Sequence, residues 1–211
     1  AILLLNTLKH SGAITAIRSG FTDISPDRRV QLVLIAWLFG AFIEGSSGFG
    51  TPAAIAAPLM VAVGFPAMAA VMIGMMIQST PVTFGAVGTP ILIGVKGGLE
   101  SPELTAQLAQ VGMNFTDYLQ LITAQSAIIH AICGTLIPTF MVVMMTRFFG
   151  KNKSWTEGLS ILPFTLLGGV AFTIPYVFTG VFLGPEFPSL IGALVGIAIM
   201  SFCAVKGVLV P

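Results

Sequence analysis

The amino-acid sequence contains no Asp, Glu, Lys or Arg between Glu44 and Lys96, a stretch of 51 residues. Shorter uncharged stretches of 29, 28 and 19 residues occupy positions 118–146, 158–185 and 187–205. A bilayer-spanning helix needs about 20 apolar residues, so each stretch has the length to cross a membrane at least once. The alternating strands of about ten residues that form a membrane β-barrel are absent. The sequence therefore predicts an all-α polytopic membrane protein with about five to six hydrophobic segments.

The composition excludes several other classes of protein. Only 8% of the 211 residues are charged, whereas a soluble domain usually carries about 25%. The formal net charge of +1 provides no basic excess for neutralising nucleic-acid phosphates. Cys133 and Cys203 each lie within an uncharged stretch, so we expect no disulfide, no metal site and no cofactor. The expected surroundings are a lipid bilayer.

The chain opens on the apolar run AILLLN, which begins with Ala1 and lacks the pattern of a signal peptide. We interpret residues 1–211 as a single transmembrane transport domain that is an internal piece of a longer protein.

Residues 30–63 predict a re-entrant hairpin. The apolar run 30–43 would form only about 21 Å of helix before Glu44 and the run GSSGFGTP, and a hydrocarbon core is about 30 Å thick. The next run, AAIAAPLMVAV, is again shorter than a span and ends at Gly64. Two short helices that flank a glycine-rich tip are typical of a hairpin that enters and leaves a membrane on one side.

Residues 66–95 predict a broken helix. A helical run reaches about Gln78 and then meets STPVTFGAVGTP, where two prolines and two glycines oppose continuous helix, before it resumes as ILIGV. Both interruptions of the apolar stretch contain Gly-Thr-Pro. Each would expose backbone at membrane depth, which is tolerated only inside protein or beside a water-filled cavity. Three plainer spanning helices are expected within residues 118–205.

The distribution of bases predicts the orientation. If residues 30–95 cross the membrane an odd number of times, Lys96 lies on one side and seven bases lie on the other: Arg18, Arg28, Arg29, Arg147, Lys151, Lys153 and Lys206. An even number of crossings would divide these eight bases equally. The positive-inside rule therefore favours the odd number and places the basic side in the cytoplasm.

Glu44 is the leading candidate for function, because an ionisable group at membrane depth is costly and is commonly retained for a role. It is a plausible carrier of a proton. The alternative is a structural role, in which the side chain snorkels or caps the backbone at the tip of the hairpin.

The two Gly-Thr-Pro segments offer backbone amides and neutral hydroxyls at the start of helices, where the partial charge is positive. This combination suits a small carboxylate without a buried arginine, although the glycines would equally serve as hinges or close packing contacts. The candidate substrate-binding residues are Gly45, Ser46, Ser47, Gly48, Phe49, Gly50, Thr51, Gln78, Ser79, Thr83, Phe84, Gly85, Gly88 and Thr89.

His130 lies in an otherwise uncharged helical run and is a second candidate for proton coupling; the alternative is a neutral histidine held by structural hydrogen bonds. No Ser/His/Asp or Cys/His arrangement and no metal-ligand spacing can be assembled, so the sequence does not predict an enzyme.

Several long segments closely resemble the bacterial lactate permease family, over nearly the whole chain. They include LIAWLFGAFIEGSSGFGTPAAIAAPLMVAVGFP, STPVTFGAVGTPILIGV and LGPEFPSLIGALVG. The family's EGxxGFGTP signature falls on residues 44–52, and its PVxFGAVGTP signature falls on residues 81–90. The family is also similar to a wider group of ion transporters that pair re-entrant hairpins with broken helices.

The resemblance implies symport of L-lactate, and often D-lactate and glycolate, with a proton across the bacterial inner membrane. Sodium coupling is an alternative, because unwound carbonyls and hydroxyls around Ser46, Thr51 and Thr89 would also suit Na⁺. A membrane-embedded enzyme and a structural subunit are weaker alternatives. The oligomeric state is not predicted, and a homo-oligomer is one of the alternatives.

Overall fold

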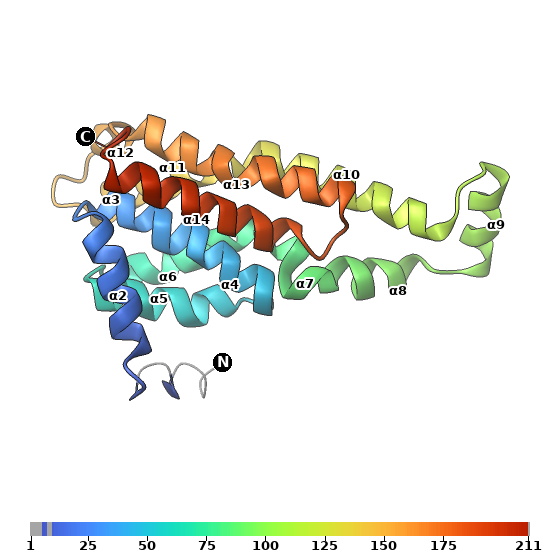
Figure 1. Cartoon of the computed structure of the whole chain (residues 1–211), viewed down its shortest axis with the longest axis horizontal. Coiled ribbons are helices and arrows are strands. Elements are labelled where there is room, and N and C mark those ends of the chain that lie inside the picture. Colours follow the sequence, from blue (N-terminus) through green and yellow to red (C-terminus); the bar gives the residue numbers. More distant parts are fainter. Residues whose placement is uncertain (1–5, 8–9, 211) are drawn as a thin grey trace.

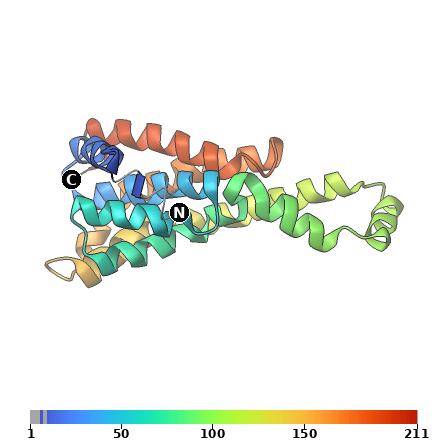
Figure 2. The ribbon, with the colours of Figure 1, turned by 90° about the horizontal axis from the view of Figure 1, so that it is seen from below.

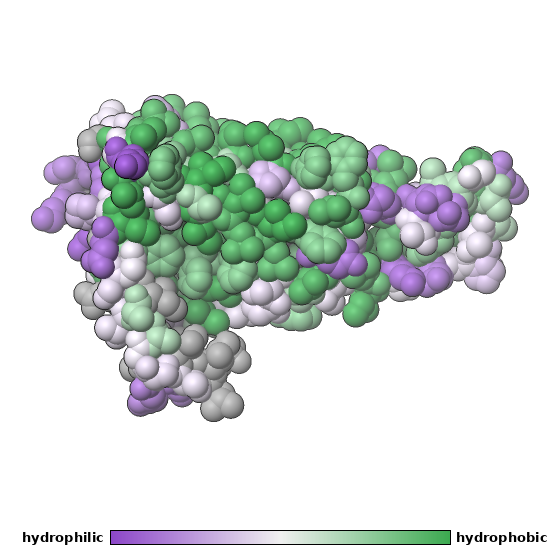
Figure 3. Space-filling model, viewed as in Figure 1, coloured by the Kyte–Doolittle hydropathy of each residue, from purple (hydrophilic) through white to green (hydrophobic). Residues whose placement is uncertain are grey.

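The computed structural model describes residues 6–7 and 10–210, and the regular structure of these residues is entirely helical (Figure 1). Five helices within this part of the chain are long and apolar enough to cross a membrane: Arg28–Ser47, Pro81–Leu99, Phe115–Phe149, Leu162–Phe182 and Pro188–Val205. On the face drawn in Figure 3, apolar residues cover most of the middle, and hydrophilic residues gather towards the two ends. These features confirm the prediction of an all-α polytopic membrane protein.

One long helix occupies the centre of the bundle. It consists of α3 (Arg28–Gln31), the π-helical stretch η1 (Leu32–Phe39) and α4 (Gly40–Ser47), which follow one another without interruption. Residues 30–38 are all buried, and η1 packs against α5, α11, α13 and α14. A helix that is apolar on every side is stable where other helices surround it. The hydrophobic run after Arg29 therefore places this central helix in the core.

The predicted hairpin has unequal arms. The central helix does not end at Ile43 but continues through Glu44 to Ser47, so its 20 residues match the thickness of a bilayer. The expectation of a short first arm was wrong. The second arm, α5 (Thr51–Val63), has 13 residues and returns alongside the first. Re-entry of this hairpin into the membrane stays a prediction.

The next helix is broken. α6 (Ala67–Met76) passes into two 3₁₀ turns, η2 (Ile77–Ser79) and η3 (Pro81–Phe84), and then into α7 (Gly85–Thr89). Helical structure resumes in η4 (Pro90–Val95) and α8 (Lys96–Leu99), as expected from the sequence of this segment. The chain then turns through α9 (Pro102–Gln110), in a helical hairpin that projects beyond the bundle (Figures 1 and 2).

Three further helical segments complete the bundle. α10 (Phe115–Gly134) and α11 (Ile137–Phe149) are nearly collinear, and α13 (Leu162–Phe182) and α14 (Pro188–Val205) pack against each other. The short α12 (Trp155–Leu159) connects α11 with α13, and α2 (Ala13–Ile24) lies across the same end of the bundle (Figure 2).

The chain places Lys96 at the opposite end of the bundle from the other bases, as expected if residues 30–95 cross the membrane an odd number of times. The central helix and α13 begin at one end of the bundle, where α11 and α14 also end, and the segments there carry Arg28, Arg29, Arg147, Lys151, Lys153 and Lys206. Lys96 begins α8 towards the opposite end. We refer to the first of these as the basic end of the bundle.

This arrangement makes a prediction about accessibility. We expect a cysteine at Lys96, in a full-length protein with Cys133 and Cys203 replaced by serine, to react with a membrane-impermeant maleimide in intact cells. A cysteine at Lys151 should react only in inverted vesicles. The reverse labelling pattern would contradict the proposed orientation.

Candidate functional site

Glu44 carries a carboxyl group that lies inside the protein. Its side chain is fully buried one turn before the end of the central helix. Neither carboxylate oxygen accepts a well-formed hydrogen bond from the described residues, and the favourable polar group beside it is the backbone amide of Gly50. Buried charged groups are normally paired or hydrogen-bonded, because water is not available to solvate them. An unpaired acid at this depth therefore marks a candidate site.

A left-handed turn follows Glu44 at the tip of the hairpin. Gly48, Phe49 and Gly50 have φ values of 62°, 54° and 75°, which lie in the region that favours glycine. The Thr51 hydroxyl donates to the Gly48 carbonyl over 2.6 Å, and Pro52 occupies the first turn of α5. The turn reverses the chain and places the start of α5 beside Glu44.

A second left-handed turn interrupts the broken helix. Ala86, Val87 and Gly88 have φ values of 46°, 56° and 79°, so α7 is not an ordinary right-handed helix. The Thr89 hydroxyl donates to the Ala86 carbonyl, again over 2.6 Å, and Pro90 begins the next helical stretch. Positive φ is strained for a β-branched residue such as Val87 and is held only where surrounding structure enforces it.

The two Gly-Thr-Pro segments share three consecutive positive φ values and a threonine hydrogen bond, and they touch; they differ at the first residue, where Gly48 has a ψ of −159° and Ala86 a ψ of 49°. A Cβ atom added to Gly48 would lie 2.7 Å from the Cβ of Ala86 and 2.8 Å from its backbone nitrogen. A Cβ added to Gly85 would lie 3.0 Å from Glu44 Oε1. The absence of a side chain at these two glycines lets the second turn approach both the first turn and the acid.

A small pocket lies between the two turns. Its volume is about 110 Å³, and its lining residues are Glu44, Gly48, Phe49, Val82, Gly85, Ala86 and Pro90. The lining is largely apolar apart from the acid. Phe49 is 87% exposed at its rim. The pocket therefore combines one ionisable group with closely packed backbone.

The carbonyl groups at the helix break have partners from three other helices. The Thr80 carbonyl accepts a hydrogen bond from the Tyr176 hydroxyl over 3.0 Å and lies 3.1 Å from Nδ1 of His130. The Pro81 carbonyl accepts a hydrogen bond from the Ser189 hydroxyl over 2.8 Å. Backbone groups at membrane depth need such partners because lipid supplies none. α10, α13 and α14 thereby hold the broken helix in place.

The loop between α13 and α14 packs on the second turn, and the start of α14 packs on the central helix. A Cβ added to Gly88 would lie 2.6 Å from the carbonyl oxygen of Pro185, and one added to Gly45 would lie 2.9 Å from Cβ of Ser189. The start of α14 therefore contacts the central helix beside Glu44 as well as the second turn. Gly45 and Gly88 act here as packing positions.

Most of the predicted hydroxyl groups already donate to backbone. Ser46 and Ser47 both donate to the Ile43 carbonyl, and Thr51 and Thr89 stabilise the two turns. Their oxygen atoms retain lone pairs, but their protons are committed in this conformation.

The remaining four candidates do not line the pocket. Gln78 lies beside the first turn, where its Oε1 would be 3.4 Å from a Cβ on Gly50. Ser79 is exposed, and Thr83 lies 3.5 Å from Nε2 of His130. Phe84 is fully buried against Tyr176, at a ring-centroid distance of 5.3 Å, and does not line the pocket.

Sequence reasoning missed Tyr176 and Ser189. Tyr176 is one of only two tyrosines, and a buried phenol needs a hydrogen-bond partner, so its position within an apolar run was a usable signal. Ser189 follows Pro188 at the start of α14 and resembles an ordinary helix-start residue. Nothing in the sequence around Ser189 indicates that its hydroxyl reaches a carbonyl 108 positions away.

Comparison with known proteins places the chain among permeases. The family model described as L-lactate permease matches residues 1–206. The L-lactate permease of Bacillus subtilis (strain 168) is 33% identical, over 95% of this chain and 31% of the relative. In Escherichia coli (strain K12), glycolate permease GlcA is 32% identical and L-lactate permease 30%, each over 93% of this chain and 31% of the relative. No solved structure gives a significant match.

The chain spans about a third of the length of these curated relatives.

The contact between the two turns predicts the effect of a methyl group. We expect Gly48→Ala to lower the thermal stability of the full-length protein in detergent, because the left-handed residue alone is strained by about 1–3 kcal/mol and the new Cβ meets Ala86. Gly94→Ala is the matched control, since a Cβ there meets nothing within 4 Å. Equal melting temperatures for the two variants would show that the turns do not pack as described.

Proposed function

The chain belongs to the L-lactate permease family, and we propose that it forms part of a secondary transporter for L-lactate and related 2-hydroxy monocarboxylates, including D-lactate and glycolate. The coupling ion in this proposal is a proton, and the membrane is the bacterial inner membrane. The lactate and glycolate permeases among the relatives support the substrate class.

The observation that carries the proposal is the buried, unpaired carboxyl group of Glu44 at the pocket between the two turns. A single ionised carboxylate without a partner is costly in a water-poor interior, whereas the protonated group is neutral. A bound proton therefore neutralises the Glu44 carboxylate when no other cation is bound.

Charge repulsion links this proton to the substrate. Two carboxylates that share a small site cannot both remain ionised at little cost. A lactate anion that enters beside Glu44 therefore requires Glu44 to carry a proton. The protonated carboxyl group can then donate a hydrogen bond to the substrate carboxylate. In this way, the lactate anion and the proton bind together.

The helices that start beyond the two turns also favour binding of an anion in the pocket. α5 and the helix that begins at Pro90 both start next to the pocket, and the beginning of a helix carries partial positive charge. These dipoles favour an anion without a buried arginine. His130 is not adjacent to the pocket lining but contacts Thr80 and Thr83 behind the break, so its proposed role is to hold that segment.

The decisive variant is Glu44→Gln in the full-length permease. Glutamine resembles the protonated acid in shape but cannot release a proton, so proton-driven accumulation of lactate in proteoliposomes should be lost while lactate exchange continues. Glu100→Gln, which changes an exposed acid in the projecting hairpin, should accumulate lactate as the wild type does. Accumulation by Glu44→Gln at the wild-type level would contradict the coupling role.

The same transport assay distinguishes sodium coupling from proton coupling. Lactate uptake at fixed pH should be unchanged when sodium is replaced by potassium. Uptake that requires sodium at fixed pH would replace the proton with Na⁺ in the proposed mechanism.

A further inference from the structure

A second cavity, larger than the pocket beside Glu44, lies at the basic end of the bundle. Its volume is about 490 Å³. Its walls come from the start of the central helix, the turn between α5 and α6, and the end of α11 with the loop that follows. The pocket beside Glu44 adjoins the other end of the central helix, so the two sites are separate.

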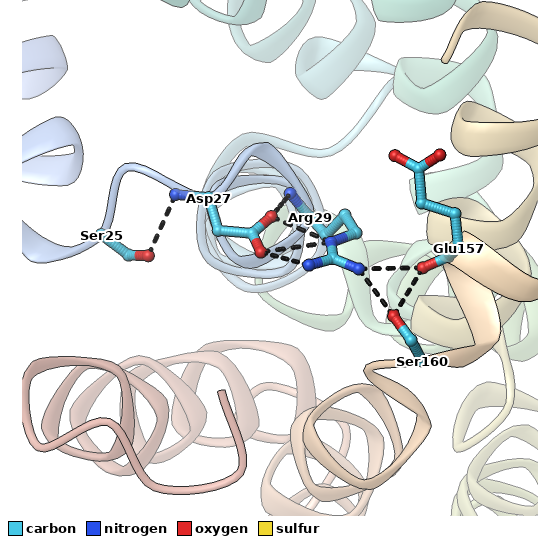
Figure 4. Close-up of polar contacts among 5 residues, drawn as sticks. All are labelled: Ser25, Asp27, Arg29, Glu157 and Ser160. Atoms are coloured by element: carbon cyan, nitrogen blue, oxygen red, sulfur yellow. Dashed lines mark hydrogen bonds and ion pairs between the residues drawn. The ribbon is translucent and has the colours of Figure 1, made fainter. Parts of the chain in front are cut away.

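One basic residue in this cavity is already neutralised. The Arg29 guanidinium pairs with Asp27, with Nη2 2.6 Å from Oδ2 and Nε 3.0 Å from Oδ1 (Figure 4). Its Nη1 donates to the Glu157 carbonyl and to the Ser160 hydroxyl, which ties the central helix to α12. Burial raises the pKa of the Asp27 carboxyl, but the hydrogen bonds and charge of Arg29 lower it more, so Asp27 stays ionised and the pair is neutral.

Two other bases line the same cavity and have no acidic partner. Arg28 and Lys151 are both exposed, and neither forms an ion pair within the described part of the chain. The one further acid in the wall is Glu157, whose carboxylate accepts a hydrogen bond from Asn152 and points away from Arg29 (Figure 4). The cavity therefore carries a net charge of +1, from three bases and two acids.

The remaining lining is largely apolar, with Thr146 and Asn152 as its polar side chains. Phe65 is nearly fully buried and Phe149 is half-buried in the cavity wall. Trp155 is half-exposed close by, with its ring 5.6 Å from the Arg147 guanidinium carbon. Tryptophan with basic residues is typical of the level of the lipid headgroups. This cavity thus joins unpaired positive charge to an apolar floor at that level.

We infer that this cavity binds the phosphate of an anionic phospholipid from the cytoplasmic leaflet. Arg28 and Lys151 contact the phosphate oxygens, and the aromatic floor accommodates the start of the acyl chains. Basic pockets between membrane helices on the cytoplasmic side favour such headgroups, because anionic lipids are enriched in that leaflet. A free phosphate ion carries the same negative charge, but it has no acyl chain that could contact the apolar floor. The inference does not depend on the transport proposal.

The test compares lipids on the purified full-length permease. Phosphatidylglycerol should raise the melting temperature in detergent more than phosphatidylcholine does. This difference should shrink in the double variant Arg28→Gln/Lys151→Gln and in Lys151→Gln alone, which changes only an exposed loop residue. Lys96→Gln, which removes a base at the opposite end, should keep the full difference. Native mass spectrometry should detect fewer bound phosphatidylglycerol molecules on the double variant.

Two results would overturn the inference. An undiminished phosphatidylglycerol effect in both Gln variants would show that Arg28 and Lys151 do not form the site. A melting-temperature shift of the same size with inorganic phosphate alone would show that the ligand is a free anion and not a lipid.

Discussion

One helix is interrupted inside this bundle and another ends there in a tight turn, and every backbone group left without a helical partner needs another one where lipid offers none. The carbonyl groups of Thr80 and Pro81 find theirs in Tyr176, Ser189 and His130, which belong to three different helices. The packing of α10, α13 and α14 around the break is therefore a condition for the break to exist. These contacts hold the broken helix where its second turn forms one wall of the pocket beside Glu44.

The same constraint explains what the two Gly-Thr-Pro segments share. Each reverses or redirects the chain through three residues with positive φ, and in each the threonine hydroxyl donates to the first carbonyl of the turn. With their local polar groups satisfied, the turns can pack directly on each other through Gly48 and Ala86. The carboxyl group of Glu44 beside the turns has no hydrogen-bond partner among the described residues. In the proposed mechanism, this carboxyl group binds the proton that accompanies the substrate.

Much of the architecture could be predicted from the sequence, because charge is so costly in a membrane that the uncharged stretches mark the helices. The length of the first hairpin arm could not be predicted in this way. Glu44, Gly45 and two serines read as the end of a helix, yet the start of α14 packs closely on Gly45 and the serines bond the Ile43 carbonyl. Tertiary contacts thus extend a helix that local propensity would end.

The site was predicted in part for the same reason. Glu44 and the glycines of both segments were identifiable, because their residue types are unusual within apolar runs. The left-handed conformation of Ala86 and Val87 was not, since both residues disfavour it and only packing against Gly48 and the α13–α14 loop accounts for it. Phe84 shows the converse: its place in a signature segment indicated the pocket, but its side chain belongs to the core.

Proton uptake on substrate binding tests the role of Glu44 most directly. The purified full-length permease is mixed with lactate in a weakly buffered solution that contains a pH indicator. The solution is kept alkaline enough for Glu44 to have released its proton before lactate is added. If Glu44 must be protonated before lactate can bind, the wild-type protein will then take up protons when lactate is added, and Glu44→Gln will bind lactate without taking them up. Equal proton uptake by the two proteins would contradict the central role of Glu44.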